Sequence, residues 1–536
     1  MVTPHRAEWA PARVQPGEDP GEPVSSPDAR RRGHVFAVHG RIELLRHEAA
    51  VVPTGPEFGF SPTWRAVVGE DVERRRPAGW GRDGVRHGRG GERVWFLDVS
   101  RPPGARLDWL LDGVRAVLAD IAGTVRPAPE RLLPLVLLPV VGIGAGGFGD
   151  DRGAVIRGLL DVADEVVAAS SVDIAFVTPD AAVHGAVQTL RRRRRRWPLD
   201  DGLLTEAESL AARARRGELA LFFGAGVSIP AGLPGWPQLL RACLDACPGL
   251  SDDSFYALHP LDQGELLRRM LGDRFGRIVA EHSTASQHAL GHALLASLGC
   301  TEVATTNYDQ CFELAAGAAD AAPLVMPWQR PHGARPWLLK LNGDVGHPES
   351  IVLARRDFVR HETLARPMAS VLESMMLTRH LLIVGASLTD DNVLRLAHEV
   401  ADVRPREPDH PEPFGTVLDV EAPGVRQQLW SGELGWVSLP GDHLLQRARA
   451  LDVFLDAVAA HTTTDASWVL DDRFEALLEE DDTEIARSAR TLRDALPDRG
   501  PWRALRAELD RHGAGRHGSR EGTGHDARRD EPTGVR

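Results

Sequence analysis

Leu219-Ala-Leu-Phe-Phe-Gly-Ala-Gly-Val-Ser228 is the stretch that decides the fold of this chain. Its first five residues are apolar enough to form a strand buried in the centre of a sheet. Glycines follow in a tight turn, and Ser228 places a hydroxyl directly after it. A strand that runs into such a turn can bring backbone N–H groups against a pyrophosphate, as in dinucleotide-binding folds. Alone, a Gly-x-Gly turn is a weak signal.

Three further predicted strands also end in polar turns. They span residues 303–306, 337–341 and 381–384, and they lead into Asn307-Tyr308-Asp309, Asn342-Gly343-Asp344 and Gly385-Ala386-Ser387-Leu388. Open α/β sheets bind ligands beyond the carboxyl ends of their strands, so the four turns predict one shared crevice. The alternative for a single turn is that its Asn or Asp caps the next helix.

In order and spacing the four motifs resemble the bacterial sirtuin-like domain, an NAD-binding family, over residues 202–465. The motif after the last strand also includes Asp390 and Asn392. The resemblance implies a Rossmann-like parallel sheet with NAD as ligand or substrate. It also implies the residues that hold the phosphates and ribose of NAD, which are Gly224, Ala225, Gly226, Ser228, Gly385 and Ser387.

Outside eukaryotes this family usually hydrolyses NAD, often as the toxic arm of an anti-phage defence system. The resemblance therefore implies an NAD hydrolase that releases ADP-ribose and nicotinamide through an oxocarbenium-like transition state. It gives Asn307 the role of orienting the nicotinamide ribose or the attacking water. Asp309 would support that loop and bind the ribose or nicotinamide region.

Position 342 departs from the family pattern. The family usually has Lys-Leu-His-Gly-Asp, with the histidine as general base, whereas this chain has Asn342. Loss of a general base typically costs ~10² to 10⁴ in rate. His332 and His347 are candidate substitutes, although we expect both in surface loops. The alternative function is a non-catalytic sensor of NAD or ADP-ribose, and a protein deacylase is third because its Cys-x-x-Cys zinc module is missing.

The region 34–195 alternates strands with helices and contains a glycine-rich loop from Gly142 to Gly149. It resembles the macro domain, the ADP-ribose-binding module, which makes an ADP-ribose-like ligand at this loop a candidate. Two motifs differ from that family: Gly40-Arg41-Ile42 replaces Gly-Asp-Ile, and Pro53-Thr54-Gly55 replaces Asn-Ala-Ala. The adenine-reading carboxylate and the ribose-contacting asparagine are thus missing, and we expect no hydrolysis by this domain.

The charge balance argues against general nucleic-acid binding, since 63 Lys and Arg face 76 Asp and Glu, a net charge of −13. One segment favours nucleic-acid binding, because residues 191–196 are six consecutive arginines. We interpret them as a solvated helix end and linker, in preference to a grip on phosphate backbones. Lys340 is the only lysine, a bias that a GC-rich genome would produce.

The four cysteines, Cys243, Cys247, Cys300 and Cys311, are too few for a disulfide scaffold, and the pair at 243 and 247 lacks further zinc ligands. We therefore expect buried free thiols and no metal site. The longest apolar stretch, residues 132–141, falls short of the ~18 to 20 residues of a membrane span. No secretory signal is evident, so we expect a cytoplasmic protein.

The predicted fold class is α/β, with a macro-like three-layer domain, a Rossmann-like sirtuin-like domain and a small helical appendage. The expected organisation is disorder over 1–33, the macro-like domain over 34–195, a linker over 196–201, the sirtuin-like domain over 202–465, helices over 466–512 and a disordered tail over 513–536. The appendage is a candidate surface for homo-oligomers or an activating partner, and the sequence does not choose between them.

Overall fold

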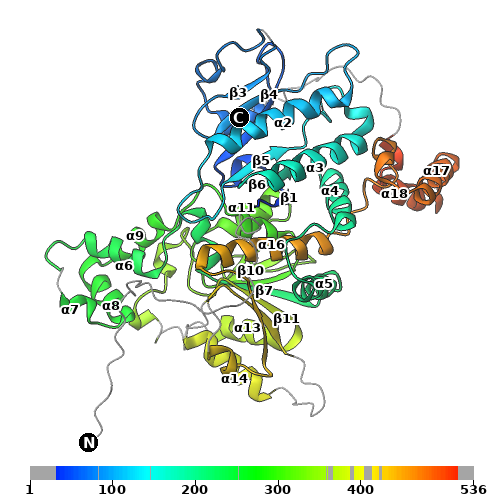
Figure 1. The fold of residues 1–536 in the computed structure, drawn as a ribbon. Helices are drawn as coiled ribbons and strands as arrows, with labels where there is room; N and C mark the ends of the chain where they lie inside the picture. The colour runs from blue at the N-terminus through cyan, green and yellow to red at the C-terminus, as the bar shows by residue number, and fades with distance from the viewer. Residues whose placement is uncertain are drawn as a thin grey trace, which may run out of the picture.

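The computed structural model describes residues 32–516, apart from 83, 145, 251–252, 358, 360–365, 387–390, 404–412 and 422–424. Within this part, the chain folds into two sheets covered by helices, which confirms the α/β class (Figure 1). None of the described helices is both long and apolar enough for a membrane span.

The N-terminal sheet has six strands in the order β1-β6-β5-β2-β4-β3, and only β3 runs antiparallel to its neighbour. The strands are β1 (Val35–His39), β2 (Ala49–Thr54), β3 (His87–Arg89), β4 (Val94–Asp98), β5 (Leu135–Pro139) and β6 (Asp173–Thr178). Its helices are α1 (Arg65–Val68), α2 (Leu107–Thr124), α3 (Arg152–Ala169) and α4 (Ala181–Arg194). Apolar residues of α2, α3 and α4 pack on one face of this sheet.

The second sheet has seven strands, all parallel, in the order β13-β12-β11-β7-β8-β10-β9. The strands are β7 (Leu219–Phe223), β8 (Glu302–Thr305), β9 (Leu324–Met326), β10 (Trp337–Lys340), β11 (His380–Val384), β12 (Gly415–Asp419) and β13 (Leu434–Ser438). The strand predicted to be central is β7. It lies between β11 and β8, and its five residues are all buried.

Helices cover both faces of the second sheet. One face packs on α5 (Asp201–Arg215), α10 (Leu290–Ala296), α11 (Cys311–Ala318) and α16 (Leu444–Thr462), and the other on α13 (Arg366–Thr378) and α14 (Asp391–Val403). A separate apolar cluster joins α6 (Trp236–Asp245), α8 (Pro260–Leu271) and α9 (Arg274–His282). The short helices α7 (Asp253–Tyr256) and α15 (Arg426–Leu429) complete this unit.

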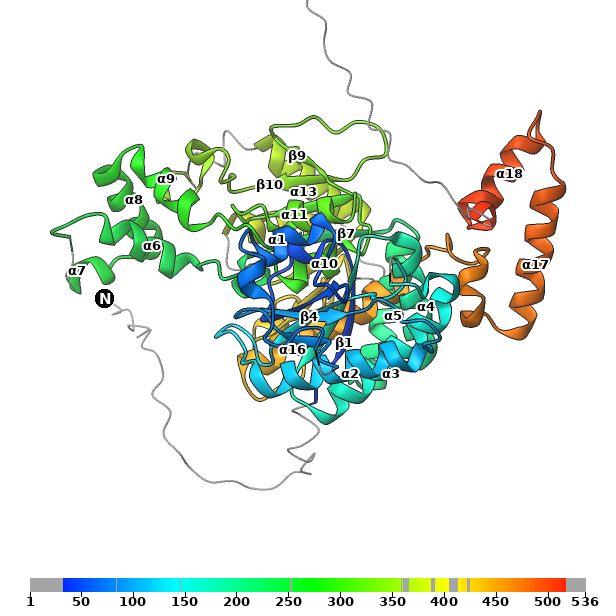
Figure 2. The same ribbon diagram turned by 90° about the horizontal axis from the view of Figure 1, so that it is seen from above.

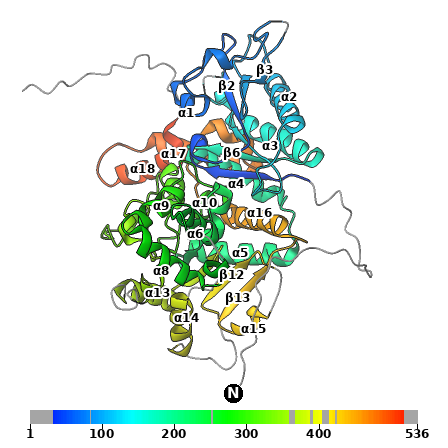
Figure 3. The same ribbon diagram turned by 90° about the vertical axis from the view of Figure 1, so that its left-hand side faces the viewer.

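The two sheets share one hydrophobic core. Phe36 of β1 and Val177 of β6 belong to the same buried cluster as Leu221 of β7 and Phe454 of α16. Figures 1 and 3 show α16 lying between the N-terminal sheet and the second sheet. The second face of the N-terminal sheet is therefore covered by helices that follow it in the chain. Domain borders at 195 and 202 remain a prediction.

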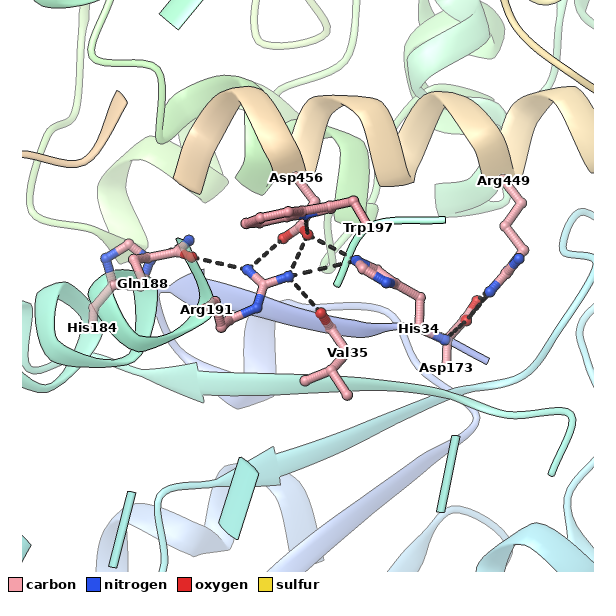
Figure 4. Close-up of polar contacts among 9 residues, drawn as sticks. All are labelled: His34, Val35, Asp173, His184, Gln188, Arg191, Trp197, Arg449 and Asp456. Carbon is pink, nitrogen blue, oxygen red and sulfur yellow. Dashed lines mark hydrogen bonds and ion pairs between the residues drawn. The ribbon is translucent and has the colours of Figure 1, made fainter. Parts of the chain in front are cut away.

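A buried polar cluster fastens α16 to the N-terminal unit (Figure 4). The carboxylate of Asp456, 0% exposed, accepts hydrogen bonds from Arg191 at 3.0 Å, His34 at 2.9 Å and the Trp197 indole at 2.8 Å. Burial alone would raise the pKa of Asp456, but Arg191 and His34 hold it well below its ordinary range. An ionised aspartate at this depth requires such a partner.

This cluster corrects the interpretation of the arginine run as a solvated helix end. Arg191 is only 6% exposed, and Arg194 pairs with Asp164 at 2.8 Å. Trp197, placed in the predicted linker, is also buried. The first arginine of the run is therefore buried, and it neutralises the carboxylate of Asp456.

The C-terminal helices α17 (Glu480–Ala495) and α18 (Trp502–Arg511) stand to one side of the two sheets (Figure 2). Within the region 466–512, where helices were expected, residues Asp472–Leu477 form a 3₁₀ helix before α17. Residues Ala514–Arg516, in the expected tail, form another. At the other end, the amide of Gly33 bonds to Val167. The remaining expected disorder, 1–31 and 517–536, lies outside the described residues.

Candidate functional site

Four turns meet at one edge of the second sheet. The neighbours β11, β7, β8 and β10 are parallel, so the turns that carry Gly385, Gly226, Asn307 and Asn342 lie side by side. The four turns share one edge of the sheet, whereas the shared crevice predicted between them stays a prediction. Ser387 lies outside the described residues. What each residue does there stays a prediction.

The glycine turn after β7 lies directly against the turn after β11. The amide of Gly224 donates to Val384 O at 3.0 Å, and that of Gly226 donates to Gly385 O at 2.9 Å. A Cβ on Gly226 would come within 2.8 Å of the same oxygen. Glycine is needed here for the close approach of two backbones. The N–H of Gly226 points to Gly385, while Ala225 begins a 3₁₀ turn beside it.

Asn307 is held in one orientation by a buried network. Its Nδ2 donates to Gly224 O at 3.2 Å and to Ser228 Oγ at 2.9 Å, and the Ser228 hydroxyl donates to Asp309 Oδ2 at 2.8 Å. Within the described structure, the Oδ1 of Asn307 is buried without a hydrogen-bond partner. An orphaned buried acceptor costs about 1–3 kcal/mol, so a ligand donor at this oxygen would recover that cost.

His292 of α10 lies beneath this network, and sequence reasoning missed it. Its Nδ1 accepts from the Ala289 amide at 3.2 Å, so in the neutral ring Nε2 carries the proton and donates to Ser228 Oγ at 3.2 Å. Burial lowers the pKa of His292 to about 4. The set Ser228, His292 and Asp309 is not a nucleophile triad, because the protonated Nε2 cannot remove a proton from the serine.

Lys340 joins two of the turns. It is 1% exposed, and its ammonium donates to Tyr308 O at 3.2 Å, Asp309 O at 2.6 Å and the carboxylate of Asp344. Glu313 completes the set at 3.0 Å. Burial would lower the pKa of Lys340, but Glu313 and Asp344 outweigh it and raise that pKa. Two carboxylates, those of Glu313 and Asp344, and two backbone carbonyls, those of Tyr308 and Asp309, thus surround one ammonium.

Asn342 is buried at the end of β10, beside the turn of Asn307. Its carbonyl accepts from the Val352 amide at 2.9 Å, while Gly343 takes a φ of +100°. Neither candidate substitute base is in a buried position. His347 is partly exposed and stacks on Trp328 with ring centroids 4.5 Å apart, and His332 is exposed.

Ligand atoms of His292, Asp309 and Cys311 lie within 4.8 Å of one another. The donor set is already satisfied: Asp309 accepts from Ser228 and from the Cys311 amide, and His292 bonds on both sides. Burial also raises the pKa of Cys311, which opposes the thiolate that a metal needs. These residues do not fit a metal, and the expectation of no metal site stays a prediction.

Two other features lie away from this edge. In the loop from Gly142 to Gly149, the side chain of Arg101 donates to Gly147 O at 3.4 Å and covers the Phe148 ring. A cavity of about 760 Å³ opens between the N-terminal unit and α16, with His34, Arg191 and Trp197 in its wall. It includes none of the four turns, so it is separate from the candidate site.

Comparison with known proteins agrees with this geometry. A family model described as the SIR2-like domain matches residues 301–433, which include Asn307, Lys340, Asn342 and Gly385. The NAD(+) hydrolase ThsA of Enterococcus faecium is 27% identical over 203 residues, 34% of this chain and 40% of that protein. ThsA of Bacillus cereus strain MSX-D12 is 30% identical over 183 residues, 32% and 38% of the two chains.

A third relative, ThsA of Acinetobacter baumannii strain 532279, is 27% identical over 180 residues, or 37% of its length. The similarity therefore spans well under half of each of these relatives. It supports the sirtuin-like part of the predicted fold, whereas the macro-like resemblance of residues 34–195 stays a prediction.

Proposed function

We propose that this chain binds NAD at the edge formed by the four turns and hydrolyses it to ADP-ribose and nicotinamide. The observation that carries the proposal is the buried Oδ1 of Asn307, which lacks a partner among the described residues and has a fixed direction. A hydroxyl of the nicotinamide ribose, or the attacking water, would donate to this oxygen. The named activity of the three relatives supports the reaction class.

The charges around the site suit this reaction. Cleavage of the nicotinamide–ribose bond builds positive charge on the ribose, and a nearby excess of carboxylate stabilises it electrostatically. The carboxylates of Glu313 and Asp344 pair with the single ammonium of Lys340, and the carboxylate of Asp309 is a third on the adjoining turn. Burial raises the pKa of Glu313, which works against its charge. Asn342 offers an amide that can position water but cannot take up its proton near neutral pH. Turnover should therefore be slow compared with a site that has histidine there, which an effector that depletes NAD in anti-phage defence can tolerate.

The test is incubation of the full chain with NAD, with products identified by chromatography and mass spectrometry. Asn307→Ala should reduce product formation at least ~10²-fold, because both its donor and its acceptor are lost. Gln263→Ala, which removes a partly exposed amide on α8, is the control and should leave turnover unchanged. Full turnover by Asn307→Ala would reject the assignment.

Asn342 favours a second candidate, a module that binds NAD or an ADP-ribose-like ligand and signals to a partner without cleaving it. Calorimetry with NAD, followed by product analysis, separates the two functions, since a sensor binds NAD and leaves it intact. For a sensor, Asn342→His should create hydrolysis that the wild type lacks. For a slow hydrolase, the same variant should raise an existing rate.

A further inference from the structure

Lys340 stands out against the composition of the whole chain. Of 63 basic residues it is the only lysine, and it is 1% exposed. The other 62 basic residues are all arginine, so the bias toward arginine does not hold at position 340. The surroundings of Lys340 supply a physical reason.

Four oxygens converge on the Lys340 nitrogen from two sides. The carbonyls of Tyr308 and Asp309 belong to the turn after β8, at 3.2 and 2.6 Å. The carboxylate of Asp344 belongs to the turn after β10, and Glu313 on α11 lies at 3.0 Å. One atom therefore links the turn of Asn307 to the turn of Asn342.

Arginine cannot reproduce this arrangement. An ammonium directs three N–H bonds tetrahedrally from one compact atom, whereas a guanidinium holds its donors in a plane, with at most two on any nitrogen. The three N–H groups of Lys340 serve Tyr308, Asp309 and Asp344, while Glu313 faces the same nitrogen as an ion pair without a hydrogen bond. A guanidinium in this buried space would push the two turns apart.

We propose that Lys340 is a positioning residue that sets the spacing between Asn307 and Asn342, and thereby the geometry in which NAD is held. Its kinetic consequence rests on the proposed function, but the spacing itself does not. Two further hydrogen bonds between the same turns support this role. Gln310 donates to Asp344 at 2.8 Å, and the Tyr308 hydroxyl donates to Val352 O at 2.8 Å. The amide of Val352 in turn donates to Asn342 O.

The decisive variant is Lys340→Arg, which keeps the charge and changes only its shape. The matched control is Arg379→Lys, the reverse exchange in an ion pair with Glu302 at the opposite end of the same sheet. Hydrogen exchange followed by mass spectrometry reads the spacing without any ligand. Peptides covering 305–313 and 338–353 should both exchange at least ~5-fold faster in Lys340→Arg and be unchanged in Arg379→Lys. Unchanged exchange in Lys340→Arg would overturn the proposal, even if NAD proves not to bind.

Kinetics give the second readout if the wild type turns over NAD. Lys340→Arg should lower kcat at least ~10-fold with a smaller change in KM, since the groups that act in the transition state are displaced. A variant with wild-type kcat would reject the positioning role. Absence of turnover in the wild type would instead count against the proposed function and leave the exchange result to decide the role of Lys340.

A third measurement uses only the wild-type protein, so a folding defect in a variant cannot affect it. Because Lys340 is the only lysine, protein labelled with ¹⁵N-lysine has a single ammonium nitrogen signal. Saturating NAD, with binding verified by calorimetry, should shift that signal, although Lys340 is too buried to touch a ligand directly. An unshifted signal in NAD-saturated protein would show that the ammonium is not coupled to the ligand and would reject the proposal.

Discussion

The Nε2–H of His292 donates to the hydroxyl of Ser228 at 3.2 Å and so determines the acceptor to which that hydroxyl can donate. Ser228 must then donate to Asp309 and accept from Asn307, which turns the Asn307 oxygen away from the network. His292→Gln keeps a donor at this reach, whereas His292→Leu removes it. We expect His292→Gln to retain NAD binding within a few-fold and His292→Leu to lose at least ~10-fold, measured by calorimetry. Equal affinity in the two variants would contradict this order.

Gly226→Ala should destabilise the protein by about 1–3 kcal/mol, as overpacked substitutions do. Its new methyl would sit 2.8 Å from Gly385 O and 2.9 Å from Gly385 Cα. The control is Gly123→Ala near the end of α2, where a Cβ meets no atom within 4 Å. Chemical unfolding gives both values. A Gly226→Ala protein as stable as Gly123→Ala would show that the two turns can separate freely.

Removing the buried carboxylate by Asp456→Leu should cost about 3–5 kcal/mol, because Arg191 is left buried without its partner. The double variant Asp456→Leu with Arg191→Met should regain a large part of this loss. Asp112→Ala, which breaks an exposed pair with Arg115, should cost no more than about 1 kcal/mol. Additive effects in the double variant, measured by urea unfolding, would show that the two groups do not stabilise each other.

Stability should fall as the pH drops below about 6.5. Burial lowers the pKa of His292 and His288 to about 4 and that of His184 to about 3, so the unfolded chain binds protons before the folded one does. Each unit of difference is worth about 1.4 kcal/mol, and the contribution is fully present above pH 6.5 and lost toward pH 4. Asp452 opposes this trend, since burial raises its pKa to about 6.

Urea unfolding at pH 7.5, 6.5 and 5.5 measures this dependence. The free energy of unfolding should be lowest at pH 5.5, because six histidines have a lowered pKa, whereas burial raises the pKa of three carboxyls, those of Asp98, Glu313 and Asp452. A value that rises toward pH 5.5 would mean that these histidines accept protons in the folded state.

Much of the second sheet was predictable because local patterns are strong there. The apolar run from Leu219 to Phe223 is β7 itself, and the polar turns after β8, β10 and β11 meet where parallel strands must end together. Asn307 and Asp309 were found because they follow a buried strand. No local signal marked His292, which lies on a separate helix and reaches Ser228 only through the packing of α10 on the sheet.

The sequence by itself determined the α/β class, the four strands β7, β8, β10 and β11 and the edge at which their turns lie, since apolar periodicity and glycine placement act over a few neighbouring residues. Tertiary structure alone decided which charges are paired. From the sequence alone, Arg191 is one of six arginines expected to be solvated, and Lys340 is explained by composition. In the structure, Asp456 of α16 pairs with Arg191, and four oxygens surround the Lys340 ammonium. The reason is physical: a buried charge is defined by partners far away in the chain, and only folding brings them within hydrogen-bonding distance.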